Sequence, residues 1–378
     1  MNKFLVVLHR WLGFPVGILF VVVFGTGAIT AVDELIGRMG HGHYEYRKTT
    51  ITEDAAALSL ITEGKEGIRQ VIMPTESTPY YQVVTRGERT TYALDDLNRV
   101  HREQQTSDDG FFRAMLQLHR NFLLGKETFL GVEGKYYVAW VTLIGLALTL
   151  LGLWLWWPRR KSFAVKDIVP RGYKRKYFYF SHLSGGVLLS GLIILLTVTG
   201  AGITYRSITQ KILGVEHTRG KPLPYAEGEQ RSLDNNWQSW LTAVQAEIRH
   251  GELTQIRFPR QPANARSGNN NVEPVMEFRV ATSDDWLGLA NSQVHINPAT
   301  STLLGVFMFK DKSVGEKLYS LLVPLHSGRS LHAGYVAVLL ILSALGALMV
   351  LSALISFAIK RRNYAPNFVK QRSQKAVS

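Results

Sequence analysis

The stretch LHRWLGFPVG, residues 8–17, opens the first long apolar run of the chain and decides how the rest is interpreted. It places His9 at the start of a membrane-length segment, and Gly13 and Gly17 follow at intervals of four residues. Residues spaced by four lie on one face of an α-helix. The spacing therefore predicts a helix with a histidine below a strip that carries almost no side chains.

Four runs of this kind occur in the 378-residue chain, and each is longer than the roughly 20 residues that cross a bilayer. They are Trp11–Val32, Tyr136–Trp157, Leu183–Tyr205 and Ala333–Ile359. We expect transmembrane helices over residues 1–32, 136–157, 181–205 and 333–359. The alternative for the first run is a cleavable signal peptide, because residues 30–32 (Thr-Ala-Val) loosely resemble a cleavage site.

The positive charge of the chain is concentrated in its short connecting pieces. The linker 158–180 holds eight Lys/Arg and one Asp, and the tail 360–378 holds six Lys/Arg and no acidic residue. The long segments 33–135 and 206–332 together hold 27 basic and 28 acidic residues, although the whole chain has a net charge of +14. This is the positive-inside pattern, so we expect a multi-pass protein of the bacterial inner membrane with cytoplasmic termini. The pattern suits anionic lipid headgroups and argues against a nucleic-acid partner.

The chain contains no cysteine, which excludes disulfides, iron–sulfur clusters, thiolate chemistry and covalently attached c-type haem. It also contains no dinucleotide fingerprint, P-loop, zincin motif or nucleophile elbow. The sequence therefore predicts no nucleotide or flavin site of its own. Any electrons that this protein handles would come from a cytoplasmic partner or from a membrane-soluble carrier such as a quinol.

The histidine pattern recurs, which indicates an internal repeat. His9, Gly13, Gly17, Thr26 and Gly27 align with His182, Gly186, Ser190, Thr199 and Gly200, all at an offset of 173 residues. The segments before the second and fourth apolar runs also correspond, and they align His119 with His326. Each long segment has the pattern of one helix followed by three strands, which is typical of an α+β module. We therefore predict four helices in two parallel repeats, with two α+β modules in the periplasm.

The recurring histidines favour a flat cofactor between two imidazoles. A histidine in a spanning segment is costly and usually has a partner, and b-type haem binds between two such rings without cysteine. We expect His9 and His182 to hold one haem near the cytoplasm, with Gly13 and Gly186 making room for it. The alternative is that the glycines are only helix-packing strips and the histidines only interfacial.

The second pair, His119 and His326, lies in segments that resemble amphipathic helices on the outer membrane surface. We expect this pair to hold a second haem, with His332 as the rival of His326 because it lies six residues further on. Arg10, Arg120 and Arg329 adjoin these candidates and would either neutralise haem propionates or only mark the interface.

Other candidates carry less weight. His41 and His43 resemble a small metal site but have no assured third ligand. The cluster WLWWP, with Trp154, Trp156 and Trp157, is typical of an aromatic belt, and an electron relay is the alternative. The remaining histidines of the long segments are expected to be structural; they are His101, His217, His250 and His295.

Six short motifs in a fixed order resemble those of the PepSY-associated transmembrane proteins. They are LHRWLG (8–13), LHRNFLLG (118–125), LWLWWP (153–158), SHLSGG (181–186), TVTGAGITY (197–205) and PLHSG (324–328). Within that family the chain is most similar to the FoxB-like inner-membrane siderophore reductases. The resemblance implies four helices, two haem b groups and reduction of ferric siderophores in the periplasm. It also matches His9 and His182 to the cytoplasmic-side pattern, and His119 and His326 to the outer pattern.

We therefore expect a ferric-siderophore reductase that carries electrons outward through two haems. One alternative is a membrane-anchored PepSY module that binds or regulates a partner and has no cofactor. Another is a haem protein that reduces a different periplasmic acceptor.

Overall fold

The computed structural model describes residues 3–39, 46–75, 79–85, 89–93, 100–101, 110–125, 128–215, 231–259 and 274–375. Within this part of the chain, four helices are long and apolar enough to cross a membrane. They are α1 (Lys3–Met39), α4 (Gly134–Trp156), α5 (Arg175–Thr204) and α9 (Ala333–Lys375). Each coincides with a predicted run, but α1 continues past residue 32, α5 starts before residue 181 and α9 continues past residue 359. The protein is a multi-pass membrane protein.

The four helices form a bundle in which α1 and α5 are diagonal. Both α4 and α9 pack against α1, and both also pack against α5. The centre of the bundle is filled by apolar side chains from α1, α5 and α9; the buried ones are Val16, Phe20, Phe24, Leu189, Ile193 and Met349. Residues of α1 and α5 that point toward the bundle axis therefore lie opposite one another across this centre.

Each diagonal helix carries a shorter one at the same end of the bundle. Helix α3 (Gly110–Asn121) packs against α1, and α8 (Val314–Ser327) packs against α5. A capping box of Ser313 and Glu316 starts α8, and Gly328 ends it with a φ of 71°, a conformation that favours glycine. Helix α6 (Arg206–Ile212) follows α5 after a break at Tyr205. The amphipathic helices expected at these places are present, but they pack on the spans rather than only on the surface.

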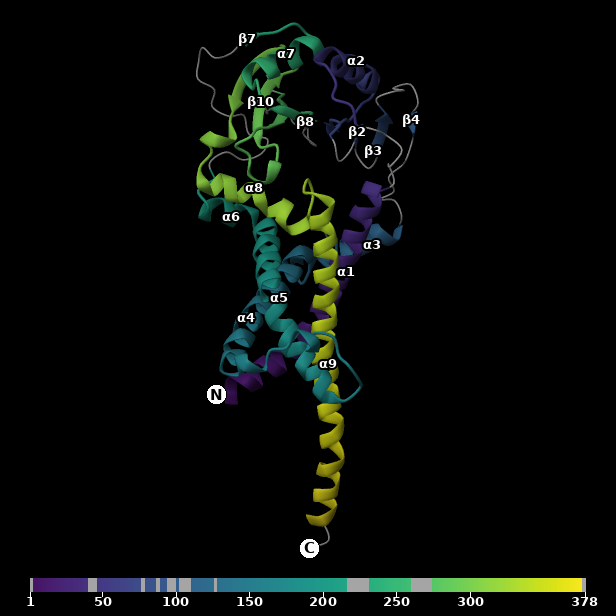
Figure 1. Cartoon of the computed structure of the whole chain (residues 1–378), viewed down its shortest axis with the longest axis vertical. Helices are drawn as coiled ribbons and strands as arrows, with labels where there is room; N and C mark the ends of the chain where they lie inside the picture. The colour runs from purple at the N-terminus through teal and green to yellow at the C-terminus, as the bar shows by residue number, and fades with distance from the viewer. Residues whose placement is uncertain are drawn as a thin grey trace.

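The two long segments build one antiparallel sheet above the bundle (Figure 1). Among the described residues, its strand order is β4-β3-β2-β1-β8-β9-β10-β11-β7. The first segment gives β1 (Gln70–Ile72), β2 (Tyr80–Val84), β3 (Arg89–Ala93) and β4 (Val100–His101). The second gives β7 (Arg231–Ser232), β8 (Glu252–Arg257), β9 (Met276–Ala281), β10 (Ser292–Asn297) and β11 (Thr302–Phe307).

The two segments therefore do not form two separate sheets. Strand β1 pairs with β8, with Val71 opposite Ile256, and this pairing covers one edge of the four strands from the first segment and one edge of the five from the second. Helices α2 (Ile51–Thr62) and α7 (Trp237–Glu247) contact each other and cover a shared apolar core that includes Leu58, Trp240 and Phe278. A short hairpin, β5 (Thr128–Phe129) with β6 (Val132–Glu133), precedes α4.

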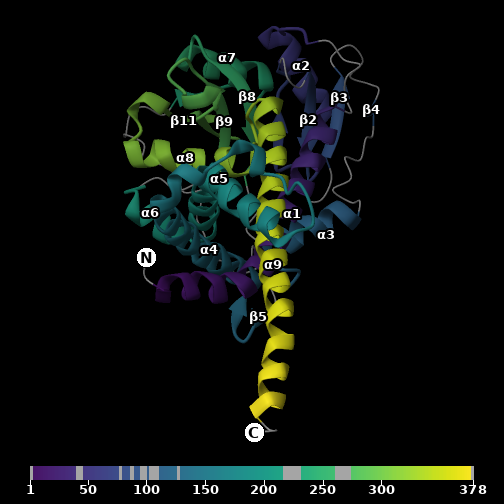
Figure 2. The same cartoon turned by 60° about the horizontal axis from the view of Figure 1, so that its bottom comes forward.

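The bundle has two distinct ends, which Figure 2 shows from below. The sheet end carries the sheet, α3, α6 and α8. The linker end carries the start of α1 and the short turns η1 (Trp157–Ser162) and η2 (Val165–Asp167) between α4 and α5. The turns η3 (Trp286–Gly288) and η4 (Phe309–Asp311) belong to the sheet end.

Candidate functional site

At the linker end, His9 of α1 and His182 of α5 face each other across the diagonal of the bundle. Their ring centroids are 6.2 Å apart and the ring planes are inclined by 44°. These residues are 173 positions apart in the sequence, and the bundle brings them together because α1 and α5 occupy opposite corners. The structure thus unites the first predicted pair.

At the sheet end, His119 of α3 and His326 of α8 form a second pair with the same geometry. Their ring centroids are also 6.2 Å apart, with an inclination of 43°. His332 lies outside this pair: its side chain is exposed, and its Nδ1 accepts a hydrogen bond of 3.0 Å from the backbone N–H of Gly334 at the start of α9. Of the two predicted alternatives, the structure places His326 opposite His119.

The rings of the sheet-end pair are held by the backbones of α1 and α5. His119 Nδ1 lies 3.0 Å from the Val23 carbonyl oxygen, and His326 Nδ1 lies 3.1 Å from that of Leu196. A carbonyl oxygen only accepts, so each Nδ1 carries the proton and donates it. The lone pair then resides on Nε2, which is the arrangement that imidazole ligands of metals adopt.

The hydroxyl groups of Thr26 and Thr199 lie beside the same nitrogens, 3.3 Å from His119 Nδ1 and 3.1 Å from His326 Nδ1. The next residues are glycines, and the reason is space. A Cβ on Gly27 would lie 3.3 Å from His119 Cε1, and a Cβ on Gly200 would lie 2.8 Å from His326 Cε1. The glycines aligned in the sequence therefore admit the imidazoles of the sheet-end pair.

The linker-end pair opens instead into a cavity of about 430 Å³. Gly13 and Gly186 line it, and a Cβ on either glycine would meet no atom within 4 Å. The strip of missing side chains therefore borders open space here and is not only a helix-packing strip. Four polar atoms in the lining are buried without a hydrogen-bond partner: His9 Nδ1, His182 Nδ1, Arg10 Nε and Trp156 Nε1.

The charges around this cavity have one sign. Arg10, Arg159, Arg175 and Lys360 line it, and no acidic side chain is found among its described lining residues. This arrangement favours an anionic occupant. The sequence had singled out Arg10, but Arg159, Arg175 and Lys360 were seen only as part of the basic cytoplasmic pieces.

Of the three tryptophans in the WLWWP cluster, two are exposed on the bundle surface and one lines the cavity. Trp154 and Trp157 are 73% and 63% exposed, as expected of an aromatic belt. Trp156 lines the cavity instead, with its indole N–H lacking a partner. Its role could not be separated from that of its neighbours in the sequence, because only the helix rotation distinguishes them.

The two arginines predicted beside the second pair are neighbours. Desolvation first, and then the nearby charge of Arg329, lower the pKa of Arg120. A third arginine of the sheet end, Arg38, donates 2.6 Å and 3.1 Å hydrogen bonds to the carbonyl oxygens of Leu331 and Gly328. Arg38 thus ties the end of α1 to the turn after α8, two residues beyond His326.

Both pairs fit a metal group held between two imidazoles. Half of the 6.2 Å centroid separation equals a metal–nitrogen bond of about 2 Å plus about 1 Å from that nitrogen to the ring centre. At the linker end, the partnerless donors, the open glycines and the cations also fit a flat anionic group such as haem b. Ligation by two histidines leaves the iron no open position, which suits electron transfer.

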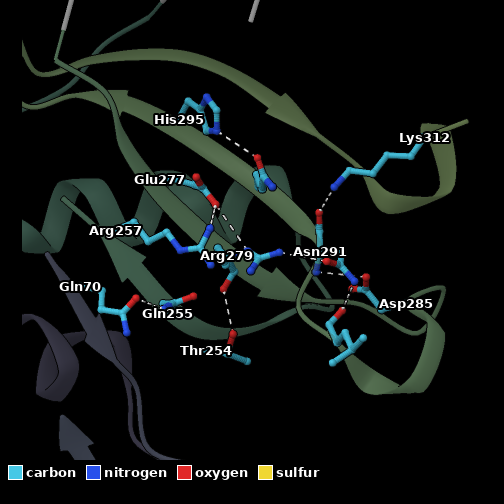
Figure 3. Close-up of polar contacts among 12 residues, drawn as sticks. Gln70, Thr254, Gln255, Arg257, Glu277, Arg279, Asp285, Asn291, His295 and Lys312 are labelled. Carbon is cyan, nitrogen blue, oxygen red and sulfur yellow. Dashed lines mark hydrogen bonds and ion pairs between the residues drawn. The ribbon is translucent and has the colours of Figure 1, made fainter. Parts of the chain in front are cut away.

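The other histidine candidates stand apart from the two pairs. His41, His43 and His217, and the side chain of His101, lie outside the described residues, and His250 is exposed. His295 is buried in the sheet with its Nε2 3.2 Å from Gln293 Oε1, and burial lowers its pKa to about 4 (Figure 3). In the part of the chain that the structure describes, no group of three or more His, Asp or Glu side chains could hold a metal ion.

His295 belongs to a polar network on the sheet face opposite α2 and α7 (Figure 3). Arg257 donates to Glu277 at 2.9 Å, and Arg279 donates to Asn291 at 2.9 Å. Lys312, the residue before the cap of α8, donates to the Asn291 carbonyl oxygen at 2.6 Å. This network connects the sheet to the start of the helix that carries His326.

Comparison with protein families identifies a match that covers most of the chain. Residues 6–360 match the family model described as the PepSY-associated TM region. No curated protein matches the chain.

Proposed function

The chain belongs to the PepSY-associated transmembrane family, and on that premise we propose that it is a di-haem electron-transfer protein that reduces ferric siderophores. One observation carries the proposal: two histidine pairs with the same 6.2 Å separation lie at the two ends of one membrane-spanning bundle. A path for electrons across a membrane needs a redox group near each face, and the two pairs would supply these positions.

The proposal includes a symmetric architecture oriented by charge. The two halves would be parallel repeats, because contacts made by Val23, Thr26 and Gly27 in α1 correspond to those made by Leu196, Thr199 and Gly200 in α5. The linker end, with its concentration of basic residues, would face the cytoplasm. The sheet would then lie in the periplasm as two joined PepSY-like modules, and the membrane would be the bacterial inner membrane.

In this mechanism the protein supplies ligands, orientation and charge, and haem b bound at each pair would supply an iron that cycles between its ferric and ferrous states. His9 and His182 would hold the inner group, while Arg10 and the other cavity cations would neutralise its propionates. His119 and His326 would hold the outer group through Nε2, with Arg120 and Arg329 nearby. The Val23 and Leu196 carbonyl oxygens would orient these rings and make their Nε2 atoms more basic.

The substrate follows from the chemistry of iron. Ferric iron is a hard ion that oxygen ligands hold tightly, and ferrous iron binds the same ligands more weakly. One electron delivered at the sheet end would therefore release iron from a ferric siderophore without breaking the chelator. The donor at the linker end would be a cytoplasmic partner or a quinol, since no nucleotide or flavin motif is present.

The test starts with purified protein in detergent. Absorption spectra before and after dithionite, with a pyridine-haemochrome count, should give two low-spin b-type haems per chain. Adding a ferric siderophore anaerobically to the reduced protein should reoxidise both haems, and a ferrous chelator should capture one Fe(II) per electron.

Two other results would each select a different function. A colourless protein after expression with ample haem would overturn the di-haem proposal in favour of a cofactor-free PepSY binding module. Two haems that ferric siderophores leave reduced would retain the electron path but point to another periplasmic acceptor.

A further inference from the structure

The middle of the bundle, between the two histidine pairs, differs between the two halves of the chain. Helix α1 places Phe20 and Phe24 there, and both are buried. The positions 173 residues later, in α5, are Ile193 and Thr197. The histidines, threonines and glycines of the two helices correspond, so the phenyl rings are a departure from an otherwise shared pattern.

The two rings are four residues apart on α1 and span about one helical turn of the interval between the pairs. From His9 to Val23, the α1 axis rises by roughly 21 Å at about 1.5 Å per residue. Phe20 lines the cavity of the His9–His182 pair, and its ring centroid lies 5.6 Å from that of Phe24. Phe24 adjoins Val23, whose carbonyl oxygen accepts the hydrogen bond from His119.

Glycines on the neighbouring helices set the positions of both rings. A Cβ on Gly145 of α4 would overlap the Phe20 ring, and a Cβ on Gly346 of α9 would lie 3.0 Å from Phe24. Each ring therefore packs directly on a helix backbone where no other residue would leave space. An ordinary apolar core would be satisfied by many side chains at these positions, so two phenyl rings with two matching glycines indicate a specific placement.

We propose that Phe20 and Phe24 form the bridge through which electrons pass between the two histidine pairs. This inference rests on the proposed di-haem function. Electron transfer through protein depends on electronic overlap, which falls steeply across gaps that contain no atoms. Phe20 and Phe24 are inclined to each other by 57° and fill this part of the path with atoms, whereas aliphatic replacements shorten the side chain and open a gap.

The proposed transfer moves one electron and changes no covalent bond. One electron would pass from an iron held by His9 and His182 to an iron held by His119 and His326, with no bond made or broken and no proton moved. The phenyl rings are not themselves oxidised. They act only as the medium, so their replacement should change a rate and leave both redox centres intact.

The test compares Phe20→Leu and Phe24→Leu with Ile193→Ala in the full-length protein. The Ile193 substitution removes the same number of carbon atoms from the same level of the core, but no ring. Haem content, midpoint potentials and thermal stability are measured first. The transfer rate between the haems is then followed after rapid reduction of one of them. Gly145→Ala is a further variant, because it displaces the Phe20 ring without deleting it.

The bridge predicts a several-fold slower transfer in Phe20→Leu, Phe24→Leu and Gly145→Ala, with two haems retained in each, and a wild-type rate in Ile193→Ala. Phe24 lies outside the lining of the His9–His182 cavity, so Phe24→Leu is the variant expected to leave both potentials unchanged. Equal slowing in Ile193→Ala would mean that loosening of the core is the cause, which overturns the bridge. Wild-type rates in the phenylalanine variants would overturn it as well. Absence of haem from the wild-type protein would instead refute the proposed function, and the two failures are thus distinguishable.

Discussion

The two ends of the bundle each hold a pair of histidine rings with nearly the same geometry, but the pairs differ in the hydrogen bonding of their Nδ1 atoms. Both pairs have a centroid separation of 6.2 Å and nearly equal inclinations, 44° and 43°. At the sheet end, each Nδ1 already has a backbone carbonyl as its partner. At the linker end, His9 and His182 approach the backbones of Leu148 and Met349 without closing a hydrogen bond at Nδ1, and Arg10 Nε and Trp156 Nε1 are buried without a partner.

Buried polar groups without partners are costly, so the difference assigns different tasks to the two ends. The sheet-end imidazoles are oriented by the protein before any ligand arrives. At the linker end, Arg10 Nε and Trp156 Nε1 remain unsatisfied until an anionic occupant or water reaches them. We therefore expect the outer site to be preorganised and the inner site to gain more of its order from its ligand.

The largest effects are expected from variants that remove one histidine ring, one variant for each end. His182→Ala should eliminate the inner haem and His326→Ala the outer haem, because each iron would lose an axial ligand. Each variant should keep about one haem per chain, measured by pyridine haemochrome, with the spectrum of the other site intact. His332→Ala is the matched control and should keep both haems. If His332→Ala loses the outer haem while His326→Ala keeps it, the assignment is contradicted.

A second test acts on the sheet to which the outer site is tied. Burial is the main cause that lowers the pKa of His295 from 6.5 to about 4; the charge of Glu277 partly offsets it, and that of Lys312 adds a smaller lowering. The unfolded chain therefore binds a proton between about pH 6.5 and 4 that the folded sheet does not, and stability falls as the pH falls through this range. The loss would be about 3 kcal/mol.

His295→Gln, which does not titrate, should remove most of this acid sensitivity. Hydrogen exchange of β9 and β10 in the full-length protein would measure it. Because the sheet leads into α8, the outer haem spectrum should change at acid pH before the inner one. Equal acid sensitivity in the wild type and the variant would show that another group is responsible.

A third test uses the glycines beside the outer rings. Gly200→Ala should displace His326, because the new Cβ would lie 2.8 Å from its Cε1, and crowding of this kind costs about 1–3 kcal/mol. Gly27→Ala should be milder, since the corresponding distance to His119 is 3.3 Å. The measurement is haem retention and outer-site midpoint potential in both variants. At the linker end, a Cβ on Gly13 would meet no neighbouring atom, so Gly13→Ala should not displace the histidine rings of that end. A displacement as large as the one expected for His326 would contradict the comparison.

The smallest effect is expected from the threonines. Thr199→Val should weaken the support of His326 by about 1 kcal/mol or less, because the Leu196 carbonyl oxygen still accepts from Nδ1. A small shift in the outer midpoint potential, with two haems retained, is the expected result. A complete loss of the outer haem would show that the hydroxyl group, and not the carbonyl, orients the ring.

Much of this arrangement could be predicted from the sequence, because the signals involved are local. Length and hydropathy located the four spans, and the family match confirms the predicted membership in the PepSY-associated transmembrane proteins. The spacing of His9 and Gly13, and its recurrence 173 residues later, indicated which histidines matter. The siderophore-reductase specificity stays a prediction.

The rest depended on contacts between residues far apart in the chain. The sequence favoured His326 and kept His332 as its rival, and only the packing of α8 on α5 shows that His326 faces His119 while His332 is exposed. We expected two separate modules. The pairing of β1 with β8 could not be foreseen, because it joins strands from different halves of the chain and has no local signal. Trp156 could not be distinguished from Trp154 for the same reason.

The sequence by itself determined the membrane spans, the charge asymmetry between the two ends and the residue types available at each end, because periodicity and charge act over a few turns of helix. The tertiary structure decided which rings face each other, because the diagonal placement of α1 and α5 follows from how α4 and α9 pack between them. It also decided that one end is completed by backbone carbonyls while the other remains open. Such differences arise from packing between distant segments, and local sequence patterns do not encode them.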